Sequence, residues 1–160
     1  MSKKSLVTVM LLSCWAFAYA QGVITGLVVG VSDGDTVKVL TPEKTEIRVR
    51  LAEIDAPESK QAFGSRSKQS LSDICFGKPA TLLVQDIDRY GRTVASVECD
   101  GVSAQKHQLN NGMAWVYDRY VKDRTLYVLQ HSAQQGLRGL WADNDPVPPW
   151  EYRHSQKVTK

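Results

Sequence analysis

Hydrophobic and polar residues alternate along several short segments of this chain, which is the pattern of strands with one buried face. The segments that we expect to be strands are residues 23–31, 36–40, 45–51, 80–87 and 93–99. The first of them contains Gly26 and Gly30, which indicate bulges or sharp curvature. The first three strands follow one another with short turns between them, so a small closed barrel is favoured over a flat sheet.

Three other segments have the spacing of amphipathic helices: residues 62–76, 102–110 and 122–135. The apolar positions are Phe63, Leu71 and Ile74 in the first helix, and Leu126, Leu129, Ala133 and then Leu137 along the last. The order of elements predicts an α+β fold, mainly β. Its centre is a five-stranded Greek-key barrel of the oligonucleotide-binding (OB) type, with about three helices. Residues 143–160 begin with structure-breaking prolines, and we expect a flexible tail there.

The first twenty residues resemble a secretory signal peptide. Lys3 and Lys4 precede an apolar run over residues 6–17, and Ala18-Tyr19-Ala20 fits a small-x-small cleavage site. The apolar run is too short to span a membrane. We therefore expect export to the periplasm or the medium, a mature domain over residues 21–142, and no stable membrane association. A lipoprotein attachment at Cys14 is the alternative.

Charge and cysteine content narrow the picture further. Without Lys3 and Lys4 the net charge falls from +3 to +1, so a nucleic-acid partner would have to be held by local clusters of basic residues. The two remaining cysteines, Cys75 and Cys99, form an even pair in a chain expected to be exported. They predict one disulfide, and two buried thiols are the alternative.

Three clusters of charged residues fall where predicted strands end: Asp33 with Asp35, Arg50 with Asp55 and Glu58, and the run Asp88-Arg89-Tyr90-Gly91-Arg92. In an ideal strand Arg50 and Asp55 would lie on opposite faces, roughly 16 Å apart. A common site therefore requires the chain to bend between them. Each cluster also has a purely structural interpretation, namely a turn for the first, a helix capping box over residues 55–58 for the second, and a solvated hairpin for the third.

Together, these acids and arginines suit phosphodiester hydrolysis. Asp35 and Asp55 could hold a hard cation with backbone carbonyls and waters. Two guanidinium groups could bind phosphate oxygens and stabilise the charge that grows on them, while Glu58 orients or deprotonates a water. No cysteine or histidine has the spacing of a zinc site. We expect the three histidines, at 107, 131 and 154, to be structural or exposed.

The motifs Asp33-Gly-Asp-Thr-Val37, Arg50-Leu-Ala-Glu-Ile-Asp-Ala-Pro-Glu58, Asp88-Arg-Tyr-Gly-Arg92 and Gly136-Leu-Arg-Gly-Leu-Trp141 resemble, in order, those of the staphylococcal (micrococcal) nuclease family, or thermonucleases. The resemblance covers about residues 22–141 and implies an OB-type barrel. It implies that Asp35, Asp55 and the Ala56 carbonyl bind calcium, with Asp33 nearby. Arg50 and Arg92 would contact the scissile phosphate, and Glu58 would be the general base. The family cleaves DNA and RNA, with calcium, to 3′-phosphates.

The chain departs from the family in its aromatic and basic side chains. The family places lysine and tyrosine around the base and the terminal phosphate, where this chain has Arg89 and Tyr90. Asp118 stands where one nucleotide-contacting tyrosine is expected, and Tyr120 matches the second. Tyr117 and Tyr120 are candidates for stacking on bases, since aromatic faces bind single strands without reading sequence. Simple packing of these rings is the alternative.

The sequence thus predicts a secreted, monomeric, calcium-dependent nuclease of exported type that acts on single-stranded or frayed regions of DNA and RNA. A barrel that binds nucleic acid without cleaving it is the second hypothesis. A disulfide-stapled module that binds a protein partner is the third. All five key positions, Asp35, Arg50, Asp55, Glu58 and Arg92, hold the residues that hydrolysis requires, which favours the enzyme.

Overall fold

The computed structural model describes residues 22–158. The predicted signal peptide and Cys14 lie outside these residues. Within the described range, no helix is both long and apolar enough to cross a membrane.

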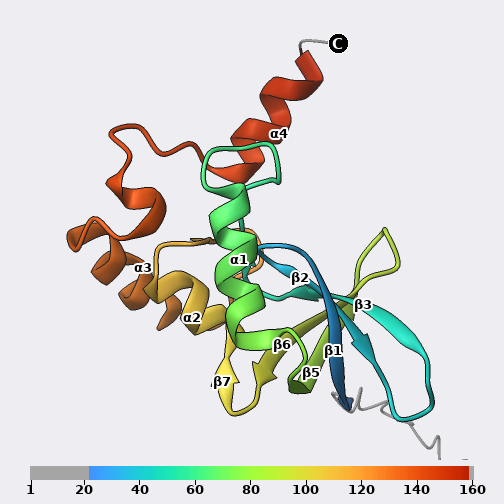
Figure 1. Ribbon diagram of the computed structural model, residues 1–160. Helices are drawn as coiled ribbons and strands as arrows, with labels where there is room; N and C mark the ends of the chain where they lie inside the picture. Colours follow the sequence, from blue (N-terminus) through green and yellow to red (C-terminus); the bar gives the residue numbers. More distant parts are fainter. Residues whose placement is uncertain (1–21, 159–160) are drawn as a thin grey trace, which may run out of the picture.

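A closed five-stranded barrel forms the centre of the molecule (Figure 1). Its strands are β1 (Val23–Asp33), β2 (Thr36–Leu40), β3 (Glu46–Leu51), β5 (Pro79–Ile87) and β6 (Thr93–Cys99). They hydrogen-bond in the order β3-β2-β1-β5-β6, and a parallel pairing of β3 with β6 closes the ring. The predicted fold class and all five predicted strands are therefore confirmed. Two short strands, β4 (Ile54–Asp55) and β8 (Trp115–Val116), pair with each other, and β7 (Val102–Ser103) adds to β6.

The long strand β1 bends through the irregularity that its glycines predicted. Its pairing with β2 shifts register between Val28 and Gly30, as a bulge does. This curvature lets one strand pair with β2 along one part of its length and with β5 along another. The barrel interior is filled by inward-facing valines and leucines of all five strands, among them Val28, Val39 and Leu82.

Helices cover one side of the barrel (Figure 1). They are α1 (Gly64–Cys75), α2 (Ala104–Asn110), α3 (Leu126–Gln135) and α4 (Pro149–Val158), with a short 3₁₀ helix, η1 (Gly139–Ala142). Leu71 of α1 and Leu109 of α2 are fully buried in the main core. The Ser103 hydroxyl caps α2, where it accepts a hydrogen bond from the Lys106 N–H.

The third predicted helix begins four residues later than its hydrophobic spacing indicated. The carboxylate of Glu53 accepts hydrogen bonds from the backbone N–H groups of Lys122 and Asp123, at 2.6 and 2.7 Å. These bonds hold residues 122–125 as a turn. The prediction for Leu137 was also wrong: it lies beyond the helix, with a positive φ of 49° and 68% of its surface exposed.

The last segment contains a helix where only a flexible tail was predicted. Helix α4 projects beyond α1 at the top of Figure 1, and it carries the last residues that the structure describes. The N–H groups in the first turn of a helix have no acceptor within that helix. Proline lacks an N–H, so it loses no hydrogen bond there and is favoured at this position. Pro149 therefore begins α4, although the prolines around it suggested that structure ends.

The predicted disulfide is present between Cys75 at the end of α1 and Cys99 at the end of β6. Both residues are fully buried. The bond fixes α1 to the barrel and encloses residues 76–98, which include β5 and most of β6.

Candidate active site

The first part of the candidate site is the tight turn between β1 and β2, which presents Asp35. Gly34 is required in this turn because a Cβ there would collide with Ser67 and Ala56. The buried side chain of Gln108 donates a hydrogen bond to the Gly34 carbonyl oxygen at 2.7 Å and so fixes the position of the turn. Asp33 accepts a hydrogen bond from the Asp35 N–H. Burial, followed by the neighbouring Asp35 carboxylate, raises the pKa of Asp33 to about 7.

Asp35 itself is 6% exposed, and neighbouring groups fix both of its carboxylate oxygens. One oxygen accepts a hydrogen bond from the Thr36 hydroxyl at 2.9 Å, and the other accepts one from the Ala56 N–H at 3.1 Å. The carboxylate is therefore held in one orientation, toward the segment that follows β3.

That segment bends, as a shared site required. After Leu51 the chain turns at Ala52 and Glu53, where Glu53 has a positive φ of 66°. The turn brings Asp55 back to Arg50: a guanidinium nitrogen of Arg50 lies 3.0 Å from Asp55 Oδ1 and 3.4 Å from Asp35 Oδ2. The same nitrogen donates to the Ile54 carbonyl oxygen at 3.1 Å. One arginine thus connects the two acids.

The electrostatics of this pair follow from its burial. Asp55 is 1% exposed, and burial raises its pKa, against the opposing effects of Arg153 and Arg50. Burial also works against the charged form of Arg50, but the carboxylates of Asp35 and Asp55 outweigh it, and the pKa of Arg50 is raised. A cation at this position is therefore strongly favoured, since it compensates two carboxylates that have little contact with water.

The capping-box interpretation of residues 55–58 is wrong. Asp55 belongs to β4, where it pairs with Trp115, and α1 begins only at Gly64. Phe63 occupies the N-cap position in a left-handed conformation and makes no side-chain capping bond. Glu58 is thus free of a capping role, and its side chain, 39% exposed, lies within hydrogen-bonding distance of the same arginine as Asp55, Arg153.

The loop between β5 and β6 carries the second predicted arginine. Asp88 organises this loop: its carboxylate accepts hydrogen bonds from the N–H groups of Tyr90 and Arg92, and from Arg92 Nε at 2.7 Å. The bonds from Arg92 lower the pKa of Asp88, although burial opposes this. Arg92 comes directly before Thr93, which pairs with Val49 of β3. The end of the β5–β6 loop therefore lies beside the strand that carries Arg50.

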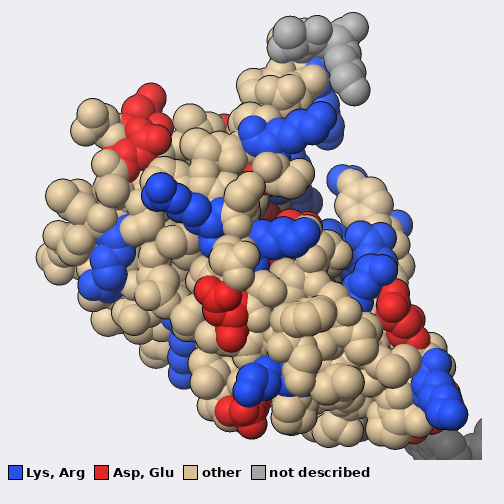
Figure 2. Space-filling model, in the orientation of Figure 1, with Lys and Arg blue, Asp and Glu red and all other residues tan. Residues whose placement is uncertain are grey.

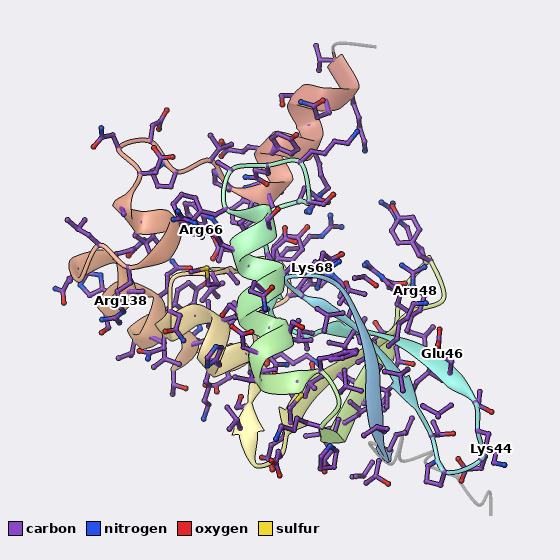
Figure 3. All side chains as sticks on the ribbon, viewed as in Figure 1. Lys44, Glu46, Arg48, Arg66, Lys68 and Arg138 are labelled. Atoms are coloured by element: carbon purple, nitrogen blue, oxygen red, sulfur yellow. A yellow bond between two sulfur atoms is a disulfide. The ribbon has the colours of Figure 1, made fainter. Side chains whose placement is uncertain are left out.

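The structure therefore brings Asp35, Arg50, Asp55 and Glu58 into one connected network. Arg92 lies in the β5–β6 loop just before β6, and among the described contacts its guanidinium bonds to Asp88 and lies over the Tyr90 ring, with its Cζ 5.6 Å from the centroid. In Figure 2 the surface is hollowed between α4 and the β5–β6 loop, with basic side chains on both sides. Figure 3 shows Lys44 in the turn before β3 and then Glu46 and Arg48 along that strand, with Arg48 close to the β5–β6 loop.

The predicted substrate-binding aromatics divide into two groups. Tyr117 lies beside the network, with the Arg50 guanidinium 5.7 Å from its ring centroid, and Tyr120 packs edge-on against Tyr117. Tyr90 is 65% exposed on the β5–β6 loop, where the Arg89 guanidinium covers it and hydrogen-bonds to its hydroxyl oxygen. Asp118, which replaces an expected tyrosine, accepts a hydrogen bond from the Tyr127 hydroxyl at 2.6 Å instead.

The sequence analysis did not identify Arg153 of α4, which is part of the network. One of its guanidinium nitrogens lies 2.7 Å from Asp55 Oδ2, and the other lies 2.7 Å from Glu58 Oε1. Its pKa is raised: burial opposes the charged form, but the hydrogen bonds that it donates to the two carboxylates prevail. Arg153 follows Glu58 by 95 residues, and no local pattern connects the two.

The donor set around Asp35 and Asp55 fits a hard cation. Two buried carboxylates point toward one position that already attracts guanidinium groups, and the Ala56 carbonyl belongs to the same segment. Among residues 22–158 no cluster of three or more histidine, cysteine, aspartate or glutamate side chains could hold a metal. A calcium ion would therefore be held by Asp35, Asp55, a backbone carbonyl and waters.

The three histidines lie outside this network. His107 is half-buried, where it hydrogen-bonds with Ser70 and Asn111, and burial lowers its pKa. His131 and His154 are exposed.

Comparisons with known proteins agree with this geometry. Residues 48–143 match the family model described as staphylococcal nuclease homologue. A protein named uncharacterized endonuclease from Escherichia coli is 42% identical over 153 residues, which cover 95% of this chain and 98% of the relative. One of the same name from Haemophilus influenzae is 44% identical, covering 82% and 74%. The micrococcal nuclease of Shigella flexneri is 42% identical and covers 82% of each chain.

Proposed function

This chain belongs to the staphylococcal nuclease family, and from that premise we propose that it is a secreted, calcium-dependent nuclease that hydrolyses phosphodiester bonds of DNA and RNA and leaves 3′-phosphate ends. The observation that carries the proposal is the convergence of Asp35, Arg50 and Asp55 on one network at the end of the barrel, with Glu58 beside it. Nucleic acids are the substrates, and extended or frayed strands reach such a site most easily.

The arginines would bind and polarise the phosphate. Arg50 is held by Asp55 and by the carbonyl oxygens of Leu51 and Ile54, so its position is fixed before a substrate arrives. Prepositioned guanidinium groups stabilise charge on non-bridging oxygens without reorganisation during the reaction. Arg92, held by Asp88, would supply the second contact.

Glu58 would act on the attacking water. Its carboxylate is 39% exposed, so a water molecule can reach it, whereas Asp55 at 2% side-chain exposure cannot serve in this way. The water oxygen attacks phosphorus and gives a proton to Glu58, the bond from phosphorus to the 5′ oxygen breaks, and the departing 5′ oxygen takes up a proton from solvent. The products are a 3′-phosphate and a 5′-hydroxyl. When bound at Asp35 and Asp55, calcium would draw charge from a phosphate oxygen.

The remaining elements of the proposal concern location and assembly. The signal-like segment over residues 1–20 supports export to the periplasm or the medium. A disulfide between Cys75 and Cys99 suits an oxidising compartment. We propose a monomer without stable membrane association. Cell fractionation, with determination of the mature N-terminus expected at Gln21, tests the export directly.

Digestion of denatured DNA and of RNA by the mature chain, with calcium and then with chelator, tests the reaction. The expected result is cleavage of both substrates that requires calcium and leaves 3′-phosphate ends. The matched control is Glu98→Gln, which removes an exposed carboxylate on β6 outside the network. Retarded but uncut nucleic acid under both conditions would instead identify a binding barrel.

A further inference from the structure

Helix α4 occupies the candidate site in two ways at once. Its Arg153 contacts the predicted metal ligand Asp55 and the predicted general base Glu58, each at 2.7 Å. Its Trp150 stacks on Tyr117, with the ring planes 3° from parallel and the centroids 5.5 Å apart. Tyr117 is the aromatic ring that lies against Arg50. The two contacts come from one helix but involve different parts of the site.

The balance of charges explains why Arg153 binds there. Three carboxylates of the network pair with two guanidinium groups: Arg50 contacts Asp35 and Asp55, and Arg153 contacts Asp55 and Glu58. Without Arg153, the buried Oδ2 of Asp55 would lose its shortest charged contact. A divalent cation held by Asp55 would meet the same need, so the guanidinium and the metal compete for one carboxylate.

The aromatic contact has the geometry of base stacking. A flat ring lying parallel to Tyr117 is the arrangement that a nucleobase adopts on an aromatic platform. Trp150 also packs edge-on against Trp115, with the centroids 5.8 Å apart. The indole therefore covers one face of Tyr117, where a nucleobase could otherwise stack.

Helix α4 is held to the rest of the protein by exposed hydrogen bonds, by the ring contacts of Trp150 and by the ion pairs of Arg153. Gln61 donates a hydrogen bond to the Val147 carbonyl oxygen just before the helix, and the Tyr152 hydroxyl donates one to the Lys60 carbonyl oxygen at 3.3 Å; both are exposed and contribute little stability. The Arg153 side chain is 38% exposed, but the carboxylate of its partner Asp55 is buried, so this ion pair is costly to break unless another cation takes its place. A divalent cation at Asp55 would remove that cost, and the helix could then leave the site.

We propose that α4 is an autoinhibitory segment: Arg153 takes the place of the cation and Trp150 takes the place of a base, and both must leave before metal and nucleic acid bind. This inference rests on the proposed function and adds a form of regulation to it. Calcium binding releases the helix, and release exposes Tyr117. Any partner that captures α4 would activate the enzyme in the same way.

The first experiment measures calcium binding to the mature protein without nucleic acid, by titration calorimetry. Arg153→Gln is compared with Lys157→Gln, which removes an equal charge from an exposed position of the same helix. If the closed state outweighs the open state about tenfold, Arg153→Gln binds calcium about tenfold more tightly than wild type, and Lys157→Gln does not. Equal affinities in wild type and Arg153→Gln would overturn the inference while leaving the proposed nuclease intact. Absence of calcium binding in all three would overturn both.

Hydrogen exchange separates release of the helix from a purely electrostatic effect. In wild type, calcium is expected to accelerate amide exchange over residues 149–158. In Arg153→Gln, exchange there is expected to be fast already without calcium. Tighter calcium binding with unchanged exchange in α4 would show that the helix stays in place, and would overturn the inference.

A second variant tests the aromatic contact independently of the ion pairs. Trp150→Ala should bind a short single-stranded oligothymidylate several-fold more tightly in the presence of chelator, because the face of Tyr117 becomes free. A thermal melt checks that the variant is folded. Weaker binding would mean that Trp150 is itself a contact for the substrate, and would overturn the inference.

Discussion

Replacing Glu58 by glutamine separates catalysis from stability in this site. Glutamine keeps the size of the side chain and can still meet Arg153, but it cannot accept a proton from water. General base catalysis contributes about 10²–10⁴ to a rate, which corresponds to about 3–5 kcal/mol of activation free energy. We therefore expect the turnover number on denatured DNA to fall at least a hundredfold.

The stability of the same variant should change little. Glu58 has one charged partner, Arg153, and both side chains are more than a third exposed, so their ion pair contributes at most about 1 kcal/mol. For a chain of this size such a loss lowers the thermal midpoint by no more than about 4 °C. The backbone contact that positions residue 58 comes from Gln61 and does not involve the carboxylate.

The assay follows the rise in ultraviolet absorbance as denatured DNA is cleaved in calcium, with Glu98→Gln as the matched control and a melt of each variant. The variant tests both roles of Glu58, that of proton acceptor and that of water-orienting group. A folded Glu58→Gln protein that works within tenfold of the wild-type rate would refute both roles.

Three further perturbations address other parts of the structure. Arg50→Gln should abolish activity and also cost about 3–5 kcal/mol of unfolding free energy in urea, because it removes the cation that lies between the buried carboxylates of Asp35 and Asp55; unchanged stability would contradict the buried network. Arg92→Ala should lower turnover by orders of magnitude with a nearly unchanged melt, and a normal rate would remove it from the site. Replacing both Cys75 and Cys99 by alanine should lower the unfolding free energy by about 3–4 kcal/mol, measured against wild type without reductant; an equal midpoint would contradict the stabilising role of the disulfide.

The sequence predicted the strands, and the acids and arginines that lie together in the structure, for a physical reason. Alternation in a strand is a local property, and the acids and arginines lie next to turns that local residues define. Asp35 and Asp55 could thus be assigned to one site before the bend at Glu53 was known. The bend itself was only required and not predicted. Glu53 has a positive φ there, and its carboxylate accepts hydrogen bonds from the N–H groups of residues 122 and 123, which lie far along the chain.

The role of α4 could not be predicted in the same way. Arg153 meets Asp55 across 98 residues of chain, and the three prolines at 146, 148 and 149 favoured an irregular tail. Only Pro149 carried a signal, because proline suits the first turn of a helix. Whether a helix docks on a distant site depends on tertiary contacts that hydrophobic spacing does not record.

The parallel pairing that closes the barrel also determines when the site can exist. Val49, Arg50 and Leu51 meet residues 93–95 only after more than forty intervening residues have folded around them. Contacts of such long range form late, because the entropy of closing a large loop must be overcome first. Until β6 joins β3, Arg50 on β3 and Arg92 just before β6 are not held side by side. If the proposed export takes place before that pairing forms, the chain carries no assembled hydrolytic centre while it is inside the producing cell.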